Sequence, residues 1–334
     1  MRKFDYSKYR DMKWGSDIMN LVSGIHEYRG RQTMYLNQKP AVLDRLVEIA
    51  KVQSTESSNA IEGIRTTTGR LKQLVEEKTT PRNRDEEEIV GYRYVLDIIH
   101  ENYEAIPITP NYILQLHRDL YRFSNKSIGG KFKNVQNQIV SYDRNGEECI
   151  VFTPLDPAEM PDAVGKICEQ YNRVTAEEEV DPLILIPIFI HDFLCIHPFN
   201  DGNGRMSRLL TTLLLYRAGY VVGRYVSIEK KIAETKGLYY DVLNQSQIGW
   251  RDGNEDATPF IRYMLQMVIA AYRDFEDRIE IVEEKKTAVD QVRAAINMKI
   301  GRFTKREIME LCPGLGKSSV ENSLSALVKE GTII

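Results

Sequence analysis

The most informative stretch of this chain, at residues 197–208, reads HPFNDGNGRMSR. Its glycine-rich turn, at residues 202–204, stands directly before a segment whose apolar residues recur with helical spacing. These apolar residues are Met206, Leu209, Leu210, Leu213 and Leu214. The pattern predicts a loop that opens a helix, which Gly219 would end with a left-handed cap. Free N–H groups at a helix start, together with the helix dipole, attract anions, and glycines let them approach the backbone. We therefore expect this loop to hold a phosphate.

Four side chains of the same stretch suit phosphate chemistry. Arg205 and Arg208 are three residues apart, so both can add charge-assisted hydrogen bonds to phosphate oxygens. Asp201 is placed to hold a divalent metal, because magnesium is usually bound by one or two carboxylates together with phosphates and waters. His197 supplies a base near neutral pH. A lone histidine or a lone Gly-Asn-Gly is more often structural, but their combination within twelve residues predicts a nucleotide site.

The rest of the sequence predicts a mainly α-helical protein. Apolar residues fall on one helix face in residues 41–52 and again in residues 89–99, and Thr109-Pro110 is typical of a helix start. The exception lies at residues 138–141 and 149–153, two β-prone runs. They flank an Asn-Gly turn at residues 143–146, which predicts a single β-hairpin.

The C-terminal part predicts a separate helical module. Residues 256–285 are expected to form a long helix that leads into a charged patch at residues 283–286. Two expected capping boxes follow, Thr304 with Glu307 and Ser318 with Glu321, each opening a short helix. A helix, a turn and a second helix of this size suggest a winged-helix-like domain.

Bulk properties exclude several classes of protein. The net charge of -3 and the pI near 6.1 give no general attraction to nucleic acid or to anionic membranes. No stretch resembles a signal peptide or a membrane span, so we expect a cytoplasmic protein without membrane contact. The four cysteines are scattered without C-x-x-C spacing, which indicates neither a disulfide framework nor a zinc site.

Residues 197–208 resemble the signature of the Fic family, HPFx[D/E]GNGRxxR, at every defined position. The resemblance implies a Fic-type helical bundle with a β-hairpin flap at residues 129–154, plus the winged-helix-like C-terminal domain. The expected division is an N-terminal helical region (1–90), a Fic catalytic core (91–255), a connecting helix (256–285) and the C-terminal domain (286–334). The implied activity is that of a protein adenylyltransferase, a nucleotidyltransferase that moves AMP from ATP to a Ser, Thr or Tyr hydroxyl of a target protein.

The resemblance also implies a role for each site residue. His197 would deprotonate the target hydroxyl, Asp201 would bind Mg²⁺, and Arg208 would grip the γ-phosphate. The residues that would cradle the α- and β-phosphates are Gly202, Asn203, Gly204 and Arg205. Tyr239, Tyr240 and Asn244 resemble the short helix that borders the nucleotide base. An equally good reading of the two tyrosines is that they pack on the core.

A second pattern, SSNAIEGI at residues 57–64, resembles the family's inhibitory motif [S/T]xxxE[G/N]. Ser58 and Glu62 are four apart on one helical face, and Gly63 would end the helix. The resemblance implies that Glu62 pairs with Arg208 and takes the space that the γ-phosphate needs. The protein would then be autoinhibited. The same glutamate could support removal of AMP, and the sequence leaves the balance of the two directions open.

The main alternative is a regulator that binds DNA or another protein through its C-terminal domain. Residues 299–334 carry six basic residues against four acidic ones, which is a weak basic excess for phosphate binding. A homodimer, and a donor nucleotide other than ATP, also stay open.

Overall fold

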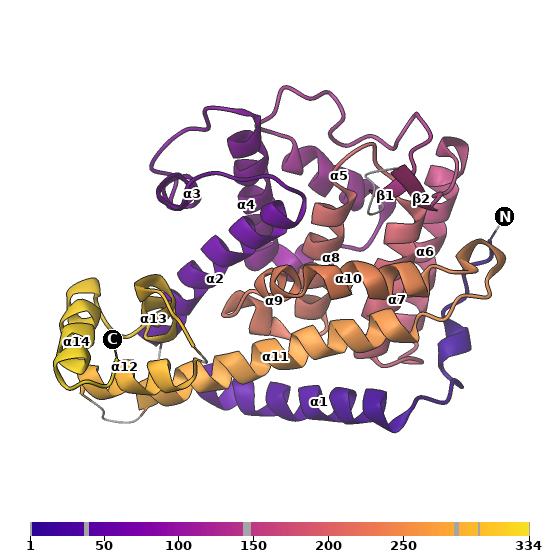
Figure 1. The fold of residues 1–334 in the computed structure, drawn as a ribbon. Coiled ribbons are helices and arrows are strands. Elements are labelled where there is room, and N and C mark those ends of the chain that lie inside the picture. The colour runs from indigo at the N-terminus through magenta and orange to yellow at the C-terminus, as the bar shows by residue number, and fades with distance from the viewer. Residues whose placement is uncertain (1, 37–39, 143–147, 284–286, 300, 334) are drawn as a thin grey trace.

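The computed structural model describes residues 2–36, 40–142, 148–283, 287–299 and 301–333. Within these residues the chain is mainly helical and has one two-stranded sheet (Figure 1), which confirms the predicted fold class. None of the helices described is both long enough and apolar enough to cross a bilayer.

Helices both precede and succeed the sheet along the chain. The α-helices before the sheet are α1 (Ser16–Leu36), α2 (Pro40–Ile61), α3 (Thr68–Val75), α4 (Arg84–Asn102) and α5 (Pro110–Leu120). The strands are β1 (Ile139–Tyr142) and β2 (Glu148–Phe152). The later α-helices are α6 (Met160–Ala176), α7 (Pro182–Ile196), α8 (Asn203–Arg217), α9 (Ile228–Glu234), α10 (Lys236–Ser246), α11 (Thr258–Glu283), α12 (Ala288–Asn297), α13 (Lys305–Leu311) and α14 (Lys317–Lys329).

Two buried helices, α7 and α8, position the HPFNDGNGRMSR loop. The α7 sequence is apolar on nearly all sides, and every residue from Leu183 to Ile196 is buried. A helix without a polar face belongs in a protein core. It packs against α6, α8 and α11, and α11 in turn runs beside α1 (Figure 1). The loop is therefore anchored at both ends by helices of the protein core.

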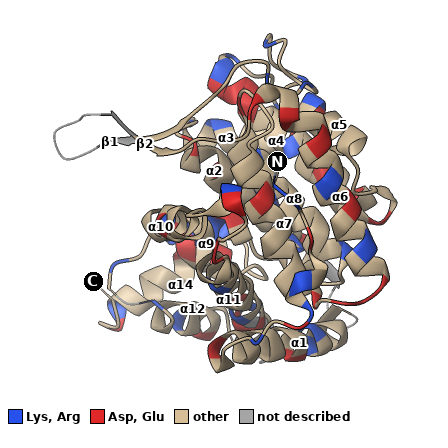
Figure 2. Ribbon diagram, turned by 90° about the vertical axis from the view of Figure 1, so that its right-hand side faces the viewer, with Lys and Arg blue, Asp and Glu red and all other residues tan. Residues whose placement is uncertain are grey.

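The predicted hairpin is present as the antiparallel pair β1 and β2, with Val140 opposite Ile150 and a register irregularity between Ile139 and Val140. It projects away from the helical body (Figure 2). The strands begin within one residue of the predicted runs. The predicted Asn-Gly turn lies outside the described residues.

The C-terminal module has a small core of its own. Its buried residues are Val292, Ala295, Ile308, Cys312, Val320 and Leu327. The capping box of Thr304 and Glu307 is confirmed. The second one is wrong, because α14 begins at Lys317 with Gly316 as its N-cap, so Ser318 already lies inside the first turn. Residues 287–299 and 301–333 include no strand, so the wing of a winged helix stays a prediction.

This module docks on α2. Arg306 of α13 forms an ion pair with Glu56 at 2.6 Å. Glu310 accepts hydrogen bonds from Gln53 of α2 at 2.7 Å and from Lys230 at 3.1 Å. Figure 1 shows α13 against the end of α2 that is far from the hairpin. One helix thus carries both the contact with the C-terminal module and, further along, the predicted inhibitory residues.

The expected domain division remains a prediction, and the structure bears on its bounds. The boundary at residue 90 falls inside α4, because Asn83 caps a helix that continues to Asn102. The expected connecting segment of residues 256–285 nearly coincides with α11.

Candidate functional site

The HPFNDGNGRMSR loop is held in place by side chains that turn inward. The Asn203 side chain accepts from the N–H of Phe199 at 2.9 Å and donates to its carbonyl at 2.8 Å. The buried Phe199 ring stacks on His117 with 3.7 Å between the ring centroids. His117 Nδ1 accepts from the N–H of Gly130, so its Nε2 donates to the carbonyl of Asp201 at 3.0 Å. Burial lowers the pKa of His117 to about 4, which keeps the ring neutral in this role.

Glycine keeps two positions of the loop small, and only the first has a backbone that requires it. Gly202 is the N-cap of α8 and has φ of 84°, in the left-handed region that side chains rarely adopt. A Cβ there would also lie 2.9 Å from the Tyr121 hydroxyl. At Gly204 a Cβ would collide with the Glu62 carboxylate. Small side chains here leave the start of α8 open to an incoming anion.

His197 is suited to accept a proton. It follows α7 as the C-cap in a left-handed conformation, with φ of 54°. Its Nδ1 lies 3.3 Å from the Leu194 carbonyl oxygen, which can only accept, so Nδ1 carries the hydrogen and Nε2 keeps a free lone pair. Burial, together with a smaller effect of the Lys133 charge, lowers the pKa of His197 to about 4. The ring is therefore a neutral base at physiological pH.

The predicted pairing of Glu62 with Arg208 is present. Arg208 Nη2 lies 2.7 Å from Glu62 Oε1 and donates to the Ser58 carbonyl at 2.9 Å. Arg208 Nε donates to the Ser58 hydroxyl at 2.8 Å. The Arg208 side chain is 3% exposed, whereas that of Glu62 is 32% exposed. The end of α2 thus covers the arginine that was expected to bind the γ-phosphate.

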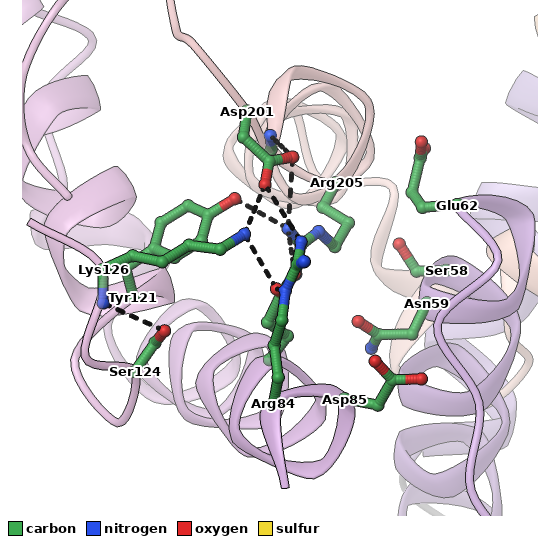
Figure 3. Close-up of polar contacts among 12 residues, drawn as sticks. Ser58, Asn59, Glu62, Arg84, Asp85, Tyr121, Ser124, Lys126, Asp201 and Arg205 are labelled. Carbon is green, nitrogen blue, oxygen red and sulfur yellow. Dashed lines mark hydrogen bonds and ion pairs between the residues drawn. The ribbon is translucent and has the colours of Figure 1, made fainter. Parts of the chain in front are cut away.

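Asp201 and Arg205 share a group of charges on the other side of the α8 start (Figure 3). Arg205 Nη2 lies 2.7 Å from Glu88 and donates to the Tyr121 hydroxyl at 2.8 Å. Asp201 accepts from Lys126 at 2.7 Å and from the N–H of Gly202 at 2.7 Å. Burial would raise the pKa of Asp201, but Lys126 and Arg205 outweigh it and lower the pKa below its usual value. Asp201 is therefore an ionised carboxylate.

Several guanidinium nitrogens of the site are buried and lack a hydrogen-bond partner among the described residues. They are Nε and Nη1 of Arg205 and Nη1 of Arg208. Leaving such donors unpaired is costly, so they are suited to phosphate oxygens. The described residues include no cluster of three side chains able to hold a metal. Asp201 alone, with phosphates and waters, is the kind of donor set that magnesium accepts.

A cavity of about 620 Å³ brings together seven of the predicted residues. They are Glu62, His197, Gly204, Arg208, Tyr239, Tyr240 and Asn244. Asp201, Gly202, Asn203 and Arg205 do not line this cavity. Tyr239 is buried and contacts Phe260 and Tyr263, whereas Tyr240 is only half-buried. Both tyrosines therefore border the cavity, and Tyr239 packs on the core as well.

Sequence reasoning missed the groups that surround the loop. The acidic run at residues 85–88 has the composition of a solvated helix start, where the helix dipole favours negative charge. Glu86 and Glu88 are instead buried, at 3% and 1% exposure. Arg70 pairs with Glu86, while Arg205 and two other cations surround Glu88. The only signal in the sequence was the run of four acidic residues near the start of α4. It does not reveal the cations that pair with Glu86 and Glu88 in the fold.

Comparison with known proteins agrees with this geometry. The model of the Fic/DOC family matches residues 107–215. Protein adenylyltransferase Fic of Nematostella vectensis is 28% identical over 236 residues, which cover 66% of this chain and 48% of that protein. Protein adenylyltransferase fic-1 of Caenorhabditis elegans is 25% identical over 208 residues, covering 59% of this chain and 36% of that protein. The chain spans half or less of the length of these curated relatives.

Solved structures share the fold. A Fic domain-containing signaling protein from Bacteroides thetaiotaomicron aligns with a TM-score of 0.63 at 24% identity, over 79% of this chain and 98% of that one. Residues 134–508 of Fic-1 from C. elegans align with a TM-score of 0.64 at 20% identity, over 80% and 74% of the two chains. Residues 107–215 are thus similar to the Fic/DOC family, and the chain shares the fold of these solved Fic structures.

Proposed function

We propose that this protein is a protein adenylyltransferase, which transfers AMP from ATP to a hydroxyl of a target protein and is held inactive by Glu62. The observation that carries the proposal is the shared cavity of His197, Gly204 and Arg208, with Glu62 paired to Arg208 at 2.7 Å. The names of the curated relatives support the same activity.

In the proposed reaction, His197 Nε2 accepts the proton of the target hydroxyl. The hydroxyl oxygen then attacks the α-phosphorus, the bond from that phosphorus to the oxygen bridging the β-phosphate breaks, and pyrophosphate leaves. The N–H groups at the start of α8 and the unpaired nitrogens of Arg205 stabilise the charge on the α- and β-phosphates. Asp201 would hold magnesium, which supplies further charge neutralisation to the leaving pyrophosphate.

Two other features fit this assignment. Tyr240 and Asn244 of α10 border the cavity, where an aromatic ring and an amide suit an adenine base. Val140 of β1 lines the same cavity, so a target segment that adds a strand to the hairpin would bring its hydroxyl near His197. Ser, Thr and Tyr are the acceptors that such a hydroxyl transfer requires.

The inhibition follows from competition for one arginine. The γ-phosphate and the Glu62 carboxylate both require Arg208, so ATP binds productively only after Glu62 turns away. The partly exposed Glu62 side chain has room to do so, whereas Ser58 is fully buried. The same carboxylate could position a water molecule for the removal of AMP.

The test is incubation of wild type and Glu62→Gly with radiolabelled ATP and magnesium. We expect weak labelling of the wild type, strong labelling of Glu62→Gly, and none of the Glu62→Gly/His197→Ala double variant. Equal labelling of all three proteins would contradict the proposal. Parallel incubation with GTP and UTP, with the added mass read by mass spectrometry, identifies the donor. Release of AMP from labelled protein by wild type but not by Glu62→Gly would reveal the reverse reaction.

A further inference from the structure

Lys126 donates to the Oδ2 oxygen of Asp201. It follows α5 in the chain, and its Nζ lies 2.7 Å from Asp201 Oδ2 and 3.0 Å from Glu88 Oε1 (Figure 3). The other oxygen, Oδ1, accepts the backbone N–H of Gly202. Both carboxylate oxygens of the expected metal ligand are therefore engaged. Each oxygen keeps a further lone pair, but a metal that binds Oδ2 comes close to the Lys126 ammonium and is repelled by its charge.

The partner that can yield is the lysine. The Gly202 N–H belongs to the rigid start of α8, whereas the Lys126 ammonium ends a flexible chain that is 25% exposed. Glu88 provides a second acceptor, because it lies within hydrogen-bonding distance of the same ammonium. Lys126 can thus release Asp201 and still keep an opposite charge beside it.

The charges of this group oppose a bare metal ion. Three cations, Arg84, Lys126 and Arg205, surround two carboxylates, Glu88 and Asp201, which leaves an excess of one positive charge. A divalent ion alone would increase this excess. An ion that arrives bound to a polyphosphate comes with the negative charge of the phosphates. That charge offsets the repulsion between the metal and the three cations.

We propose that Lys126 is a built-in counter-cation of Asp201, which blocks the carboxylate until a metal–nucleotide complex displaces the lysine toward Glu88. The proposal rests on the proposed function only in taking Asp201 as the metal ligand. Lys126 is a positioning residue, since it acts through Asp201. It makes metal binding depend on the nucleotide.

The test measures binding of Mn²⁺ by electron paramagnetic resonance in the absence of nucleotide, so no turnover is needed. The Lys126→Met variant frees Asp201 and should bind Mn²⁺ about fivefold more tightly than wild type, the upper scale of a partly exposed ion pair. In the Glu62→Gly background, where Arg208 is open to the γ-phosphate, a non-hydrolysable ATP analogue should tighten Mn²⁺ binding more with Lys126 present than with Lys126→Met, because only the former has a lysine to displace.

Arg84→Met is the matched control. It removes one positive charge from the same group, but Arg84 lies 3.9 Å from Asp201 and its side chain is 67% exposed. We expect a change of about twofold or less for this variant. Unchanged or weaker Mn²⁺ binding by Lys126→Met, or equal effects of both variants, would overturn the proposal. Asp201→Asn separates the role of Asp201 as metal ligand from the role of Lys126. If Asp201→Asn leaves Mn²⁺ binding unchanged, Asp201 is not the metal ligand, and that part of the proposed function is wrong.

Discussion

Replacing Glu62 by glutamine tests how the charge of Glu62 contributes to inhibition. Arg208 makes two hydrogen bonds to Ser58 of α2 and one to Glu62, the residue that follows α2, and only the one to Glu62 joins opposite charges. Glutamine keeps an acceptor oxygen at the same reach but removes the charge. A charge-assisted hydrogen bond contributes about 1.5–3 kcal/mol and a neutral one about 0.5–1.5 kcal/mol. Because water screens the partly exposed Glu62, we take a difference of about 1 kcal/mol, which is about fivefold in binding.

Glu62→Ala extends the series by removing the acceptor altogether. The loss of about 2 kcal/mol corresponds to roughly a thirtyfold gain in productive binding of ATP. Titration calorimetry with magnesium and ATP gives the affinity, and initial rates of protein labelling give the activity. Both should rise in the order wild type, Glu62→Gln, Glu62→Ala. Glutamine and alanine variants that both match the wild type would refute the idea that Glu62 competes for Arg208.

Three further predictions concern the base, the helix packing and the loop. In the Glu62→Gly background, kcat/KM should stay level from about pH 8 to about pH 5 and fall at lower pH. The reason is that protonation of His197, with a pKa near 4, removes the base. A fall in kcat/KM that begins near pH 6.5 would contradict this. Gly91→Ala should lower the free energy of unfolding by about 1–3 kcal/mol in urea, because its Cβ would collide with the Leu120 carbonyl and push α4 from α5. The control Gly165→Ala, on α6 with open space around it, should be neutral or stabilising. His117→Phe keeps an aromatic ring on Phe199 but leaves the Gly130 N–H and the Asp201 carbonyl without their partner. We therefore expect the free energy of unfolding to fall by about 1–3 kcal/mol. A urea midpoint equal to that of wild type would argue against this role of His117.

The parts of the site that sequence could predict are those encoded locally. The glycine loop, its two arginines and the Ser58–Glu62 spacing each depend on residues within a few positions of one another, so periodicity and capping rules reach them. The meeting of α2 with α8 came from family resemblance, because no local rule pairs residues 146 positions apart.

The groups that sequence could not predict act across long separations. His117 supports Asp201 from 84 positions away, and Lys126 reaches it from 75. Glu88 looks like any acidic residue near the start of a helix, and only the packing of α4 against α8 makes it buried. The one capping error arose because Gly316, which has no side chain to signal a cap, caps α14 two residues before the predicted Ser318.

The two contacts of α2 also fix its length between them. Glu56 faces α13 and Glu62 faces Arg208, and each residue added to a helix rotates all later residues by about 100°. An insertion of one residue between them would turn Glu62 to another side while leaving the contact with Arg306 intact. An insertion of seven residues would nearly restore the angle but shift the carboxylate by about 10 Å along the axis. The spacing from Glu56 to Glu62 therefore tolerates substitution far better than any change in length.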